Sequence, residues 1–451
     1  MDYNIYMNLP LFVTDFMKSF TDKGYKIYLV GGAVRHMLMG HEIVNWDFTT
    51  NAKPDEIMKL HERSFYNNNF GTVGTPIEVE GDTIVMETTT FRREAEYTDA
   101  RRPNRVEWAD NLEEDLGRRD FTINAMAYDG NDIVDPYGGQ EDIGKKVIRA
   151  VGDADVRFNE DALRLMRAVR QAAQLGFMIE PETMTSLQKN AELITKISWE
   201  RIRDELFKLL SSPHAADGVL ILKNAGLLMH ILPEVEICFT VPQKSPNRHH
   251  IYDVGTHLVE SLRHCPSVDV ITRFATLIHD VGKAKTFRKD EHIGQITFYN
   301  HEVVGGKQAE EIAERFKLSN KEKEKLVLLV KHHQFSVTEE QSDKAIRRFI
   351  RDVGLENIDD MLALRTGDRI GGGAKPTSWR TELFKKRIVE VQHVPFAVTD
   401  LKIKGTDVMD VLGIKPGPKV GEILNTIFAE VDDGKMENER KILLARLQEL
   451  K

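Results

Sequence analysis

Two patterns of hydrophobic and polar residues divide this chain. Up to about residue 150, short β-rich runs such as KIYLV, TPIEVE and TIVMETTTF alternate with helical patterns and with turn clusters such as DPYGG. From Asp161 onward, segments such as DALRLMRAVRQAAQLGF repeat apolar residues at spacings near three and four, which is typical of amphipathic helices. The pattern predicts an α/β unit followed by an all-helical remainder.

The helical remainder divides further at a polar, proline-bearing linker, VPQKSPNRHH, at residues 241–250. A helical connector ends near Ala225, and a histidine-rich helical segment reaches to about Arg380. The last module, LKIKGTDVMDVLGIKPGPKVGEIL, is punctuated by glycine and proline. In this chain of 451 residues we expect a head at 1–150, a neck at 151–225, a histidine-rich domain at 240–380 and a tail at 381–451.

Charge and cysteine usage narrow the class of protein. The net charge of −9 and the pI near 6.0 argue against a protein coated in basic residues, although a local basic stripe suffices for nucleic-acid binding. Cys238 and Cys265 are the only cysteines, so we expect neither a disulfide framework nor a cysteine zinc site. No apolar run approaches the roughly 18 residues that a membrane span needs. The expectation is a cytoplasmic protein without a membrane partner.

An acidic tripeptide on the second apolar run, Asn45-Trp46-Asp47, points to metal chemistry. Side chains two residues apart on a β-strand project together, and two carboxylates so placed could hold two divalent cations about 4 Å apart for phosphoryl transfer. Here one of the two is an amide, which is a weaker ligand than a carboxylate for the hard cation Mg²⁺. Glu87, in METTTFR on a later strand, supplies a further acidic group that could meet the same metal.

Phosphate binding is indicated by Gly31 and Gly32, which follow an apolar strand and open a helical run. Backbone N–H groups at a helix N-terminus can approach a phosphate closely where glycine leaves room. Alone, a glycine pair after a strand is more often an ordinary turn. Arg35 is placed to hold a triphosphate oxygen, although an isolated arginine is more often solvated or ion-paired at the surface.

Two further motifs follow in order, LEEDLGRRDFTINAMAYD at 112–129 and RFNEDALRLMRAVRQAAQLGF at 157–177. With the glycine motif and the acidic tripeptide, they make roughly the first 210 residues resemble the class II tRNA nucleotidyltransferase and bacterial poly(A) polymerase superfamily. The resemblance implies an α+β fold, in which a small mixed-sheet catalytic head precedes an all-helical neck, body and tail. It also implies template-independent addition of nucleotides to an RNA 3′ end, with Mg²⁺ in the head and ATP and CTP as substrates.

The resemblance assigns roles to residues of this chain. The family's metal-binding acidic pair maps onto Asn45 and Asp47, and its protein template for the incoming base maps onto the segment with Asp161 and Arg164. These two residues lie three apart on one face of a predicted helix and offer acceptors and donors to a base edge, with a surface salt bridge as the alternative. The family's ribose and triphosphate motif corresponds to Arg118, Arg119, Asp120 and Asn124. Arg167 and Arg170 continue the predicted helix and are placed to contact phosphate, with solvated side chains as the alternative.

The long, charged segment from Phe91 to Leu116 bears on which nucleotides are added. In the family a flexible loop here permits the change from C to A addition, and its retained length favours CCA addition, or A addition alone, over CC addition. The stretch FGTVGTPIEVEG resembles the CCA-adding branch rather than the poly(A) polymerase branch, which typically carries an arginine-rich stretch here. This favours the tRNA 3′ end as the partner, with a poly(A) polymerase as the alternative.

Two departures from the family pattern concern catalysis. His36 and Asn45 both stand where the family usually has aspartate. Loss of a metal-binding carboxylate is expected to cost on the order of several kcal/mol of transition-state stabilisation, at about tenfold in rate for each 1.36 kcal/mol. We expect a weakened or inactivated head, and three accounts stay open: an inactivated variant, an enzyme that uses Asp47 with Glu87, or a head that binds RNA without catalysis.

After the linker, histidines and aspartates recur at helix-compatible spacings that suit two divalent ions. The candidate ligands are His257, His279, Asp280 and Asp368 for one ion, and His301 with His332 or His333 for a second. The segment resembles an HD-type metal-dependent phosphohydrolase domain of the kind fused to some bacterial tRNA nucleotidyltransferases. The resemblance implies hydrolysis of phosphomonoesters or 2′,3′-cyclic phosphates, with Lys283 assisting phosphate binding, and a purely structural helical body is the alternative.

Two hypotheses give the head a lesser role. In one, hydrolysis in the histidine-rich domain is the only working chemistry and the head is an RNA-binding module. In the other, the chain is a non-catalytic tRNA-binding protein. In either case RNA is expected along the helical body and the tail, where LGIKPGPKVGEIL offers lysines beside glycine turns, although a capped helix pair explains that tail equally well.

Overall fold

The computed structural model of the chain describes residues 9–66, 71–97, 103–109, 111–243, 252–289, 295–335, 338, 340–391, 398–433 and 435–451. The chain forms two compact units, Met1–Glu236 and Ile237–Lys451. The boundary between them falls after the predicted neck and before the predicted histidine-rich domain. Most of the predicted linker, residues 244–250, lies outside the described residues.

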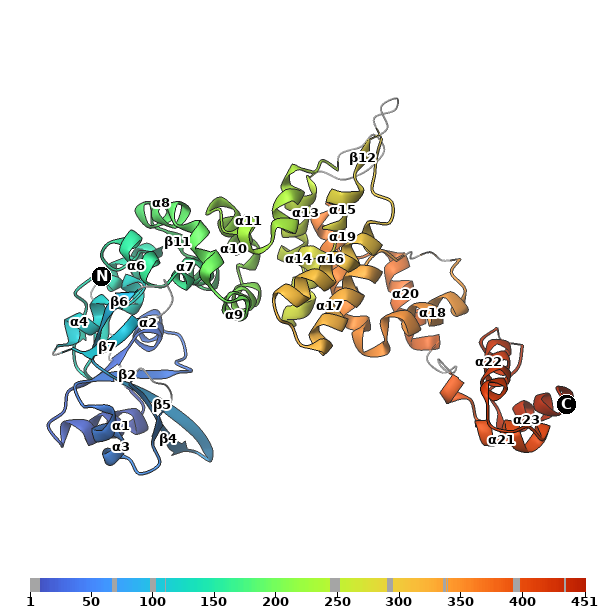
Figure 1. Cartoon of the computed structure of the whole chain (residues 1–451), viewed down its shortest axis with the longest axis horizontal. Helices are drawn as coiled ribbons and strands as arrows, with labels where there is room; N and C mark the ends of the chain where they lie inside the picture. The colour runs from blue at the N-terminus through green and yellow to red at the C-terminus, as the bar shows by residue number, and fades with distance from the viewer. Residues whose placement is uncertain are drawn as a thin grey trace. The chain divides into compact units, whose positions relative to one another are not determined.

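A seven-stranded mixed sheet forms the head of the first unit (Figure 1). In spatial order its strands are β3 (Phe65–Tyr66), β4 (Thr72–Val79), β5 (Asp82–Thr90), β2 (Trp46–Thr50), β1 (Ile27–Val30), β8 (Ala127–Tyr128) and β9 (Ile133–Val134). β2 and β5 run parallel, and the other neighbours are antiparallel. The mixed sheet and the helices that follow it confirm the predicted α+β fold.

Alternation of buried and exposed side chains fixes the register of this sheet. On β5, Met86 is buried and the next residue, Glu87, is exposed, so a slip of one residue would bury a carboxylate. Helices α1 (Leu11–Thr21), α2 (Gly32–Met39) and α3 (Pro54–Leu60) share one apolar core with the sheet. That core includes Val13, Phe16, Phe20, Val34, Phe48, Ile57 and Met86.

The segment expected to be a flexible loop contains a two-stranded ribbon. β6 (Arg92–Tyr97) pairs antiparallel with β7 (Pro103–Trp108), and Arg93 Nε donates across the pair to Glu107 Oε2 at 3.0 Å. Opposite charges at directly paired positions stabilise such a ribbon. The prediction of a flexible loop rested on turn residues and charge, and it did not consider pairing between strands. Residues 98–102 and 110 of this segment lie outside the described residues.

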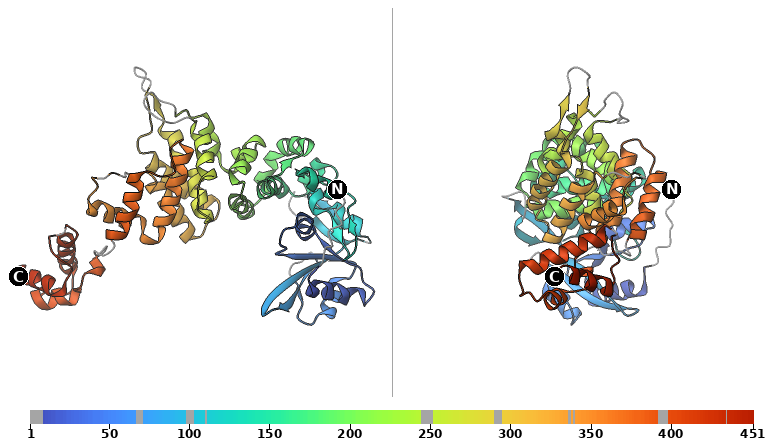
Figure 2. Two further views of the ribbon diagram at one scale, coloured as in Figure 1. Left: turned by 180° about the vertical axis from the view of Figure 1, so that it is seen from behind. Right: turned by 90° about the vertical axis from the view of Figure 1, so that its right-hand side faces the viewer.

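Helices make up most of the rest of the first unit (Figure 2). They are α4 (Leu112–Gly117), α5 (Gly139–Lys145), α6 (Ala154–Glu160), α7 (Leu163–Leu175), α8 (Pro181–Lys189), α9 (Trp199–Leu210), α10 (Ala215–Asn224), α11 (Leu228–Ile231) and α12 (Pro233–Glu236). A short parallel pair, β10 (Val147–Ile148) with β11 (Met178–Ile179), joins the end of the head to the neck. The neck helix α7 is buried along most of its length, which anchors the residues that it carries.

Among its described residues, the second unit is helical apart from one small hairpin. Its helices are α13 (Val254–Arg263), α14 (Val270–Ile278), α15 (Gly282–Thr286), α16 (His301–Arg315), α17 (Asn320–His332), α18 (Asp343–Val353), α19 (Ile358–Gly371), α20 (Trp379–Glu390), α21 (Gly405–Leu412), α22 (Pro418–Asp432) and α23 (Arg440–Glu449), and the hairpin is β12 (Arg288–Lys289) with β13 (Ile296–Thr297). The last three helices have a core of their own. None of the helices in the described part of the chain is long and apolar enough to cross a bilayer.

Candidate active sites

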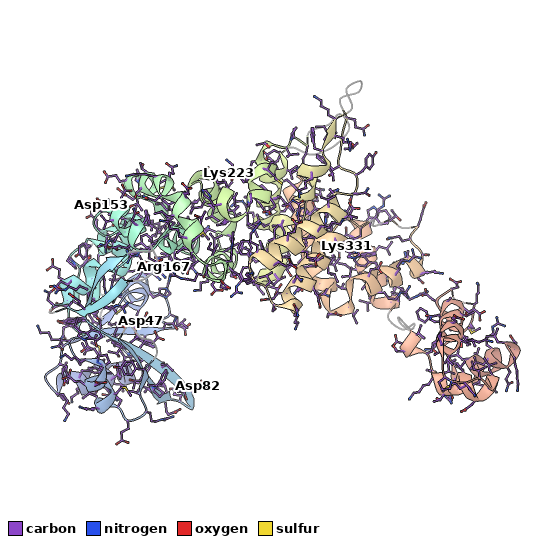
Figure 3. All side chains as sticks on the ribbon, in the orientation of Figure 1. Asp47, Asp82, Asp153, Arg167, Lys223 and Lys331 are labelled. Atoms are coloured by element: carbon purple, nitrogen blue, oxygen red, sulfur yellow. The ribbon has the colours of Figure 1, made fainter. Side chains whose placement is uncertain are left out.

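A cavity of about 540 Å³ in the first unit gathers the residues that the sequence motifs single out. All of the predicted nucleotide-binding residues line it: Gly31, Gly32, Arg35, Arg118, Arg119, Asp120, Asn124, Asp161, Arg164, Arg167 and Arg170. Asn45 and Asp47 line it as well, whereas Glu87 does not. The sheet supplies Asp47 and the neck supplies Arg167 (Figure 3). The structure therefore brings these residues into one site, and their individual roles stay predictions.

The glycine turn lets the backbone reach this cavity. Gly31 has φ +67°, a conformation that other residues rarely adopt, and it directly precedes α2. A Cβ atom at position 31 would lie 3.2 Å from Nη1 of Arg119. A side chain here would therefore strain the backbone and crowd an arginine of the cavity.

The three candidate metal ligands of the head come from neighbouring positions. β2 begins at Trp46, so Asn45 lies just before the strand rather than on it, and Asp47 pairs in register with Glu87 on the parallel strand β5. Burial raises the pKa of Asp47, the negative charge of Glu87 raises it further, and Arg119 opposes both. Two neighbouring carboxylates beside a neutral amide oxygen form a set of hard oxygen donors suited to Mg²⁺.

Most arginines of the cavity are held by buried or half-buried carboxylates. Seven arginines line the cavity, and six of them pair with acidic residues. The pairs are Arg118 and Arg119 with Asp115, Arg164 with Glu160, Arg167 with Asp120, Arg170 with Glu205, and Arg201 with Asp161. Burial alone would raise the pKa of Asp120, but Arg167 and Asn124 hold it well below its ordinary value.

Arg35 is the exception among these arginines. Within the described residues it donates to the neutral Oδ1 of Asn124 and forms no ion pair. Burial lowers the pKa of Arg35 to about 10, and the positive charges of Arg170 and Arg167 act in the same direction, against Asp120. A cation in this state is stabilised by an arriving anion, so Arg35 is where the cavity most favours a phosphate.

The predicted base-reading pair does not lie on one helix face. α6 ends at Glu160, Asp161 has an extended conformation, and α7 begins at Leu163, so the expected continuous helix is wrong at this point. Asp161 Oδ1 accepts from the backbone N–H of Leu163 at 3.1 Å. This local turn interrupts the helix, although the apolar pattern of the sequence continues through it. Arg164 donates to the backbone carbonyls of Arg157 and Arg118 at 3.0 and 2.9 Å. The pair still faces one cavity, from two elements.

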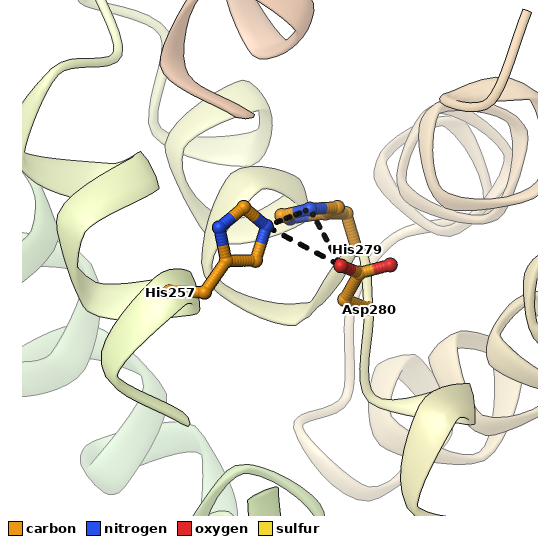
Figure 4. Close-up of side chains that lie close together, drawn as sticks. All are labelled: His257, His279 and Asp280. Atoms are coloured by element: carbon orange, nitrogen blue, oxygen red, sulfur yellow. Dashed lines mark hydrogen bonds and ion pairs between the residues drawn. The ribbon is translucent and has the colours of Figure 1, made fainter. Parts of the chain in front are cut away.

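The second unit contains a buried cluster of imidazoles and carboxylates. Both groups of three metal-binding side chains found among the described residues lie here: His257, His279 and Asp280 (Figure 4), and Asp280, His301 and His333. Asp368 Oδ1 extends the first group, at 3.3 Å from His257 Nε2 and 3.6 Å from His279 Nε2. Asp280 joins the two groups, since Oδ2 lies 3.3 Å from His257 Nε2 and Oδ1 lies 3.2 Å from His301 Nε2.

The backbone fixes which imidazole nitrogen faces the cluster. Nδ1 of His279, His301 and His333 lies 2.8, 2.8 and 2.6 Å from the carbonyl oxygens of Thr276, Phe298 and Val330. Because a carbonyl only accepts, each Nδ1 carries the hydrogen, and the Nε2 lone pair of the neutral ring points into the cluster. This donor set of imidazole nitrogens and carboxylate oxygens fits a divalent transition metal, with Asp280 able to bridge two ions.

Charge within the cluster favours a cation. Burial would lower the pKa of His279, but Asp280 and Asp368 raise it to about 10. Burial would raise the pKa of Asp280, but Lys283 and His279 hold it well below its ordinary value. The carboxylates thus stabilise positive charge at this place, whether it is carried by a proton or by a metal ion.

His332 does not join the cluster, so of the two neighbouring candidates only His333 stands as a predicted ligand. His332 is half-buried and belongs to neither group of metal-binding side chains, whereas His333 Nε2 lies 3.4 Å from Asp280 Oδ1. Successive side chains around a helix point about 100° apart, so only one of two adjacent histidines can face the same ion.

A cavity of about 400 Å³ opens beside the cluster. Asp280, Asp368, His301 and His333 line one part of it, and Lys283 lines it too. Lys283 Nζ lies 2.5 Å from Asp280 Oδ2 and donates to Gln243 Oε1 at 2.8 Å. The predicted phosphate-binding lysine is thus at the site, already paired with a candidate metal ligand.

Sequence motifs miss residues that hold these sites together. Asp115 is fully buried and accepts from Arg118 and Arg119, and Arg365 lines the second cavity while donating to Asp368 at 2.9 Å. Arg118 and Arg119 follow Asp115 by three and four residues, and this spacing could have predicted the ion pairs from the sequence. A similar spacing of three links Arg365 to Asp368.

A mixed sheet that carries acidic ligands beside an arginine-rich cavity is suited to nucleotidyl transfer. Three family models match the chain: the poly A polymerase head domain at residues 27–149, the probable RNA and SrmB-binding site of polymerase A at 176–238, and the putative tRNA nucleotidyltransferase domain 2 at 286–447.

Two relatives align with nearly the whole chain. The A-adding tRNA nucleotidyltransferase of Deinococcus radiodurans is 34% identical over 413 residues, which is 88% of this chain and 90% of the relative. The CCA-adding enzyme of Levilactobacillus brevis is 33% identical over 438 residues, 95% of each chain. Among solved structures, the Bacillus stearothermophilus CCA-adding enzyme in complex with CTP superposes with a TM-score of 0.72 at 29% identity, covering 97% of this chain and 96% of the other. The chain belongs to the tRNA nucleotidyltransferase and poly(A) polymerase family.

Proposed function

We propose that this protein adds CCA to tRNA 3′ ends, as CMP and AMP from CTP and ATP. The observation that supports this most directly is the half-buried Arg35, whose hydrogen-bond partner in the described structure is an amide, in a cavity that also contains Asp47. A polyphosphate entering this cavity gains an arginine that no carboxylate has neutralised. The nucleotide complex of a structural relative and the names of the full-length relatives agree with this substrate class.

Each part of the cavity has a task in the proposed reaction. Gly31 and Gly32 bring the N-terminus of α2 to the phosphates, and Arg35, Arg118 and Arg119 hold their oxygens. Asp161 and Arg164 present an acceptor and donors to the base edge. Mg²⁺, when bound by oxygens of Asp47, Glu87 and Asn45, neutralises phosphate charge and acidifies the attacking hydroxyl.

Asn45 limits this reaction in our proposal. Its amide oxygen carries no net charge, so the head has one carboxylate fewer than two neighbouring cations call for. Burial raises the pKa of Asp47 and the charge of Glu87 raises it further, and the two residues pair in register, which supports a site in which these two carboxylates share the cation. The proposed head is therefore active at a reduced rate.

The test uses a tRNA transcript that ends just before CCA, incubated with Mg²⁺ and with CTP, ATP or both. Addition of three nucleotides only when both are present supports the proposal. Extension by A alone, and only on transcripts ending in CC, would assign the A-adding activity instead. Long A tracts on unrelated RNA would point to a poly(A) polymerase, and binding without extension would leave the head an RNA-binding module.

A second activity is favoured by a separate observation. The buried cluster of the second unit presents four imidazoles and two carboxylates, with Asp280 between the two groups. We propose that it binds divalent metal and hydrolyses phosphomonoesters or 2′,3′-cyclic phosphates, as a repair step before nucleotide addition. A bound metal of this kind supplies hydroxide at neutral pH. Unchanged turnover of a 2′,3′-cyclic phosphate in a His279→Ala variant would reject the assignment.

A further inference from the structure

The cavity beside the histidine cluster has aromatic side chains in its lining. Thr297, Phe298, Tyr299 and Asn300 line it together with the cluster residues and Glu302. Tyr299 is 77% exposed, although Phe298 next to it is buried. Asn300 has φ +61° and directly precedes α16, so a tight turn presents Tyr299 at the opening of the cavity. An aromatic face that is open to solvent at the edge of a cavity can stack on a nucleobase.

Positive side chains also lie on the elements next to this cavity. The strand next to Thr297 in the β12–β13 hairpin carries Arg288, which pairs in register with Thr297, and Lys289. Both side chains are exposed, as is Lys285 at the end of α15. None of these three cations forms an ion pair with a carboxylate in the described part of the chain, within a protein of net charge −9. The hairpin extends from the helices of its unit (Figures 1 and 2).

The size of the cavity separates the inner and outer contacts. At about 400 Å³ it is near the lower end for ligand cavities, so it has room for one terminal nucleotide and not for a longer strand. A free mononucleotide has its single phosphate inside, next to the cluster, and nothing to offer to Arg288 or Lys289. A strand has further phosphates outside the cavity, where those cations lie.

We propose that this opening binds the 3′ end of a single RNA strand, with a base stacked on Tyr299 and backbone phosphates on Lys285, Arg288 and Lys289. The terminal phosphate then reaches the cluster, so the inference rests on the proposed hydrolysis and specifies its substrate as a strand end rather than a free nucleotide. Contacts outside the cavity add affinity for each phosphate that follows the terminal one.

The test compares two substrates of the full-length protein loaded with divalent metal: an RNA hexamer ending in a 2′,3′-cyclic phosphate, and 2′,3′-cyclic AMP. In the Arg288→Glu, Lys289→Glu variant we expect KM for the hexamer to rise about tenfold or more and KM for cyclic AMP to stay within about twofold. Tyr299→Ala should raise KM for the hexamer about fivefold, in line with the loss of one stacked base. Lys307→Glu, Lys321→Glu is the control, because it makes the same change in net charge at exposed positions of α16 and α17.

A readout without turnover accompanies this comparison: fluorescence anisotropy of the same hexamer ending in a 3′-phosphate, titrated at several salt concentrations. Weaker binding and a smaller salt dependence in the Arg288→Glu, Lys289→Glu variant than in the control support the inference. Equal effects in that variant and the control, or equal effects on both substrates, overturn it. If the wild type hydrolyses neither substrate, the proposed hydrolysis fails, and the anisotropy comparison still decides whether the opening binds RNA.

Discussion

The head cavity and the histidine cluster differ in how many metal ligands the protein itself supplies. Seven arginines line the head cavity, and its candidate metal ligands are two carboxylates and an amide. The cluster instead holds four imidazoles and two carboxylates, nearly all buried and within 3.6 Å of a neighbour. Mg²⁺ is usually bound by one or two carboxylates together with substrate phosphates, whereas a cage of imidazoles and carboxylates binds metal by itself. We therefore expect the first site to be completed by its nucleotide and the second to be assembled beforehand.

Removal of Asp47 should break the head site most severely. In Asp47→Ala we expect nucleotide incorporation into tRNA to fall by about three orders of magnitude or more, because the site loses its best placed carboxylate. Hydrolysis of 2′,3′-cyclic AMP should not change. Asp82→Asn, at the exposed end of β5 in the same sheet, is the control and should incorporate at the wild-type rate. Equal losses in the two variants would mean that the sheet, and not the ligand, had been damaged.

Removal of Asp280 should impair the histidine cluster and leave the head site intact. Because this carboxylate lies between both groups of the cluster, Asp280→Ala should lose bound metal and about 100-fold or more in hydrolysis, while nucleotide incorporation is kept. Metal content by mass spectrometry after dialysis checks the first point and parallel assays the second. Asp343→Ala, an exposed carboxylate on α18, serves for comparison. Wild-type metal content in Asp280→Ala would contradict the assignment of the cluster.

Restoring a carboxylate at position 45 should strengthen the head site, whereas the two preceding substitutions each remove a ligand. Asn45→Asp should raise the rate of incorporation about tenfold or more at saturating nucleotide, since the added charge strengthens a metal site that acts in the transition state. Asn51→Asp, just after β2 in the same sheet, controls for added negative charge. No gain in rate would contradict the interpretation of Asn45 as a metal ligand that is weaker than a carboxylate.

Loss of Asp115 should have the smallest effect on the reaction. Asp115→Asn leaves Arg118 and Arg119 without their buried anion, and we expect KM for the nucleotide to rise about threefold to tenfold with kcat less changed. Glu113→Gln, exposed on the same helix, is the matched control. An unchanged KM would show that the two arginines need no such support.

The same carboxylate gives a pH dependence of known sign. Burial alone would raise the pKa of Asp115, but Arg118 and Arg119 lower it below its ordinary value. The ion pairs therefore stabilise the fold fully above about pH 4, the ordinary range of an aspartate, and this stabilisation is lost as the pH falls through the lower pKa of the folded state. Urea unfolding between pH 7 and 3 should show a shallower loss of stability in Asp115→Asn than in the wild type.

Much of the head could be predicted because its chemistry is confined to short motifs. Gly31 and Arg35, then Asp120 and Asn124, are each fixed by local spacing, and a mixed sheet with buried neck helices brings them into one cavity. The break at Asp161 escaped prediction because apolar periodicity runs through it, and only the turn made by its own side chain interrupts the helix.

Other features depend on contacts between distant segments. The choice of His333 over His332 follows from the rotation of α17 against the cluster, which spacing alone leaves open. The β6–β7 ribbon depends on cross-strand pairs, and charge along a single segment does not reveal them. Sequence patterns thus predicted most of the residues that gather at both sites, whereas the geometry of the sites required tertiary contacts.

We propose that this chain carries two separate sites that act in succession on an RNA end. The most direct measurement follows, on a sequencing gel, a tRNA transcript that ends before CCA in a 2′,3′-cyclic phosphate, in the presence of CTP, ATP and divalent metal. The wild type should open the cyclic phosphate, hydrolyse the resulting phosphomonoester to a free 3′-hydroxyl and inorganic phosphate, and extend that end. Asp280→Ala should extend only a transcript with a free 3′-hydroxyl, and Asp47→Ala should remove the phosphate without extending the end. Extension of the cyclic end by Asp280→Ala as fast as by the wild type would contradict the claim.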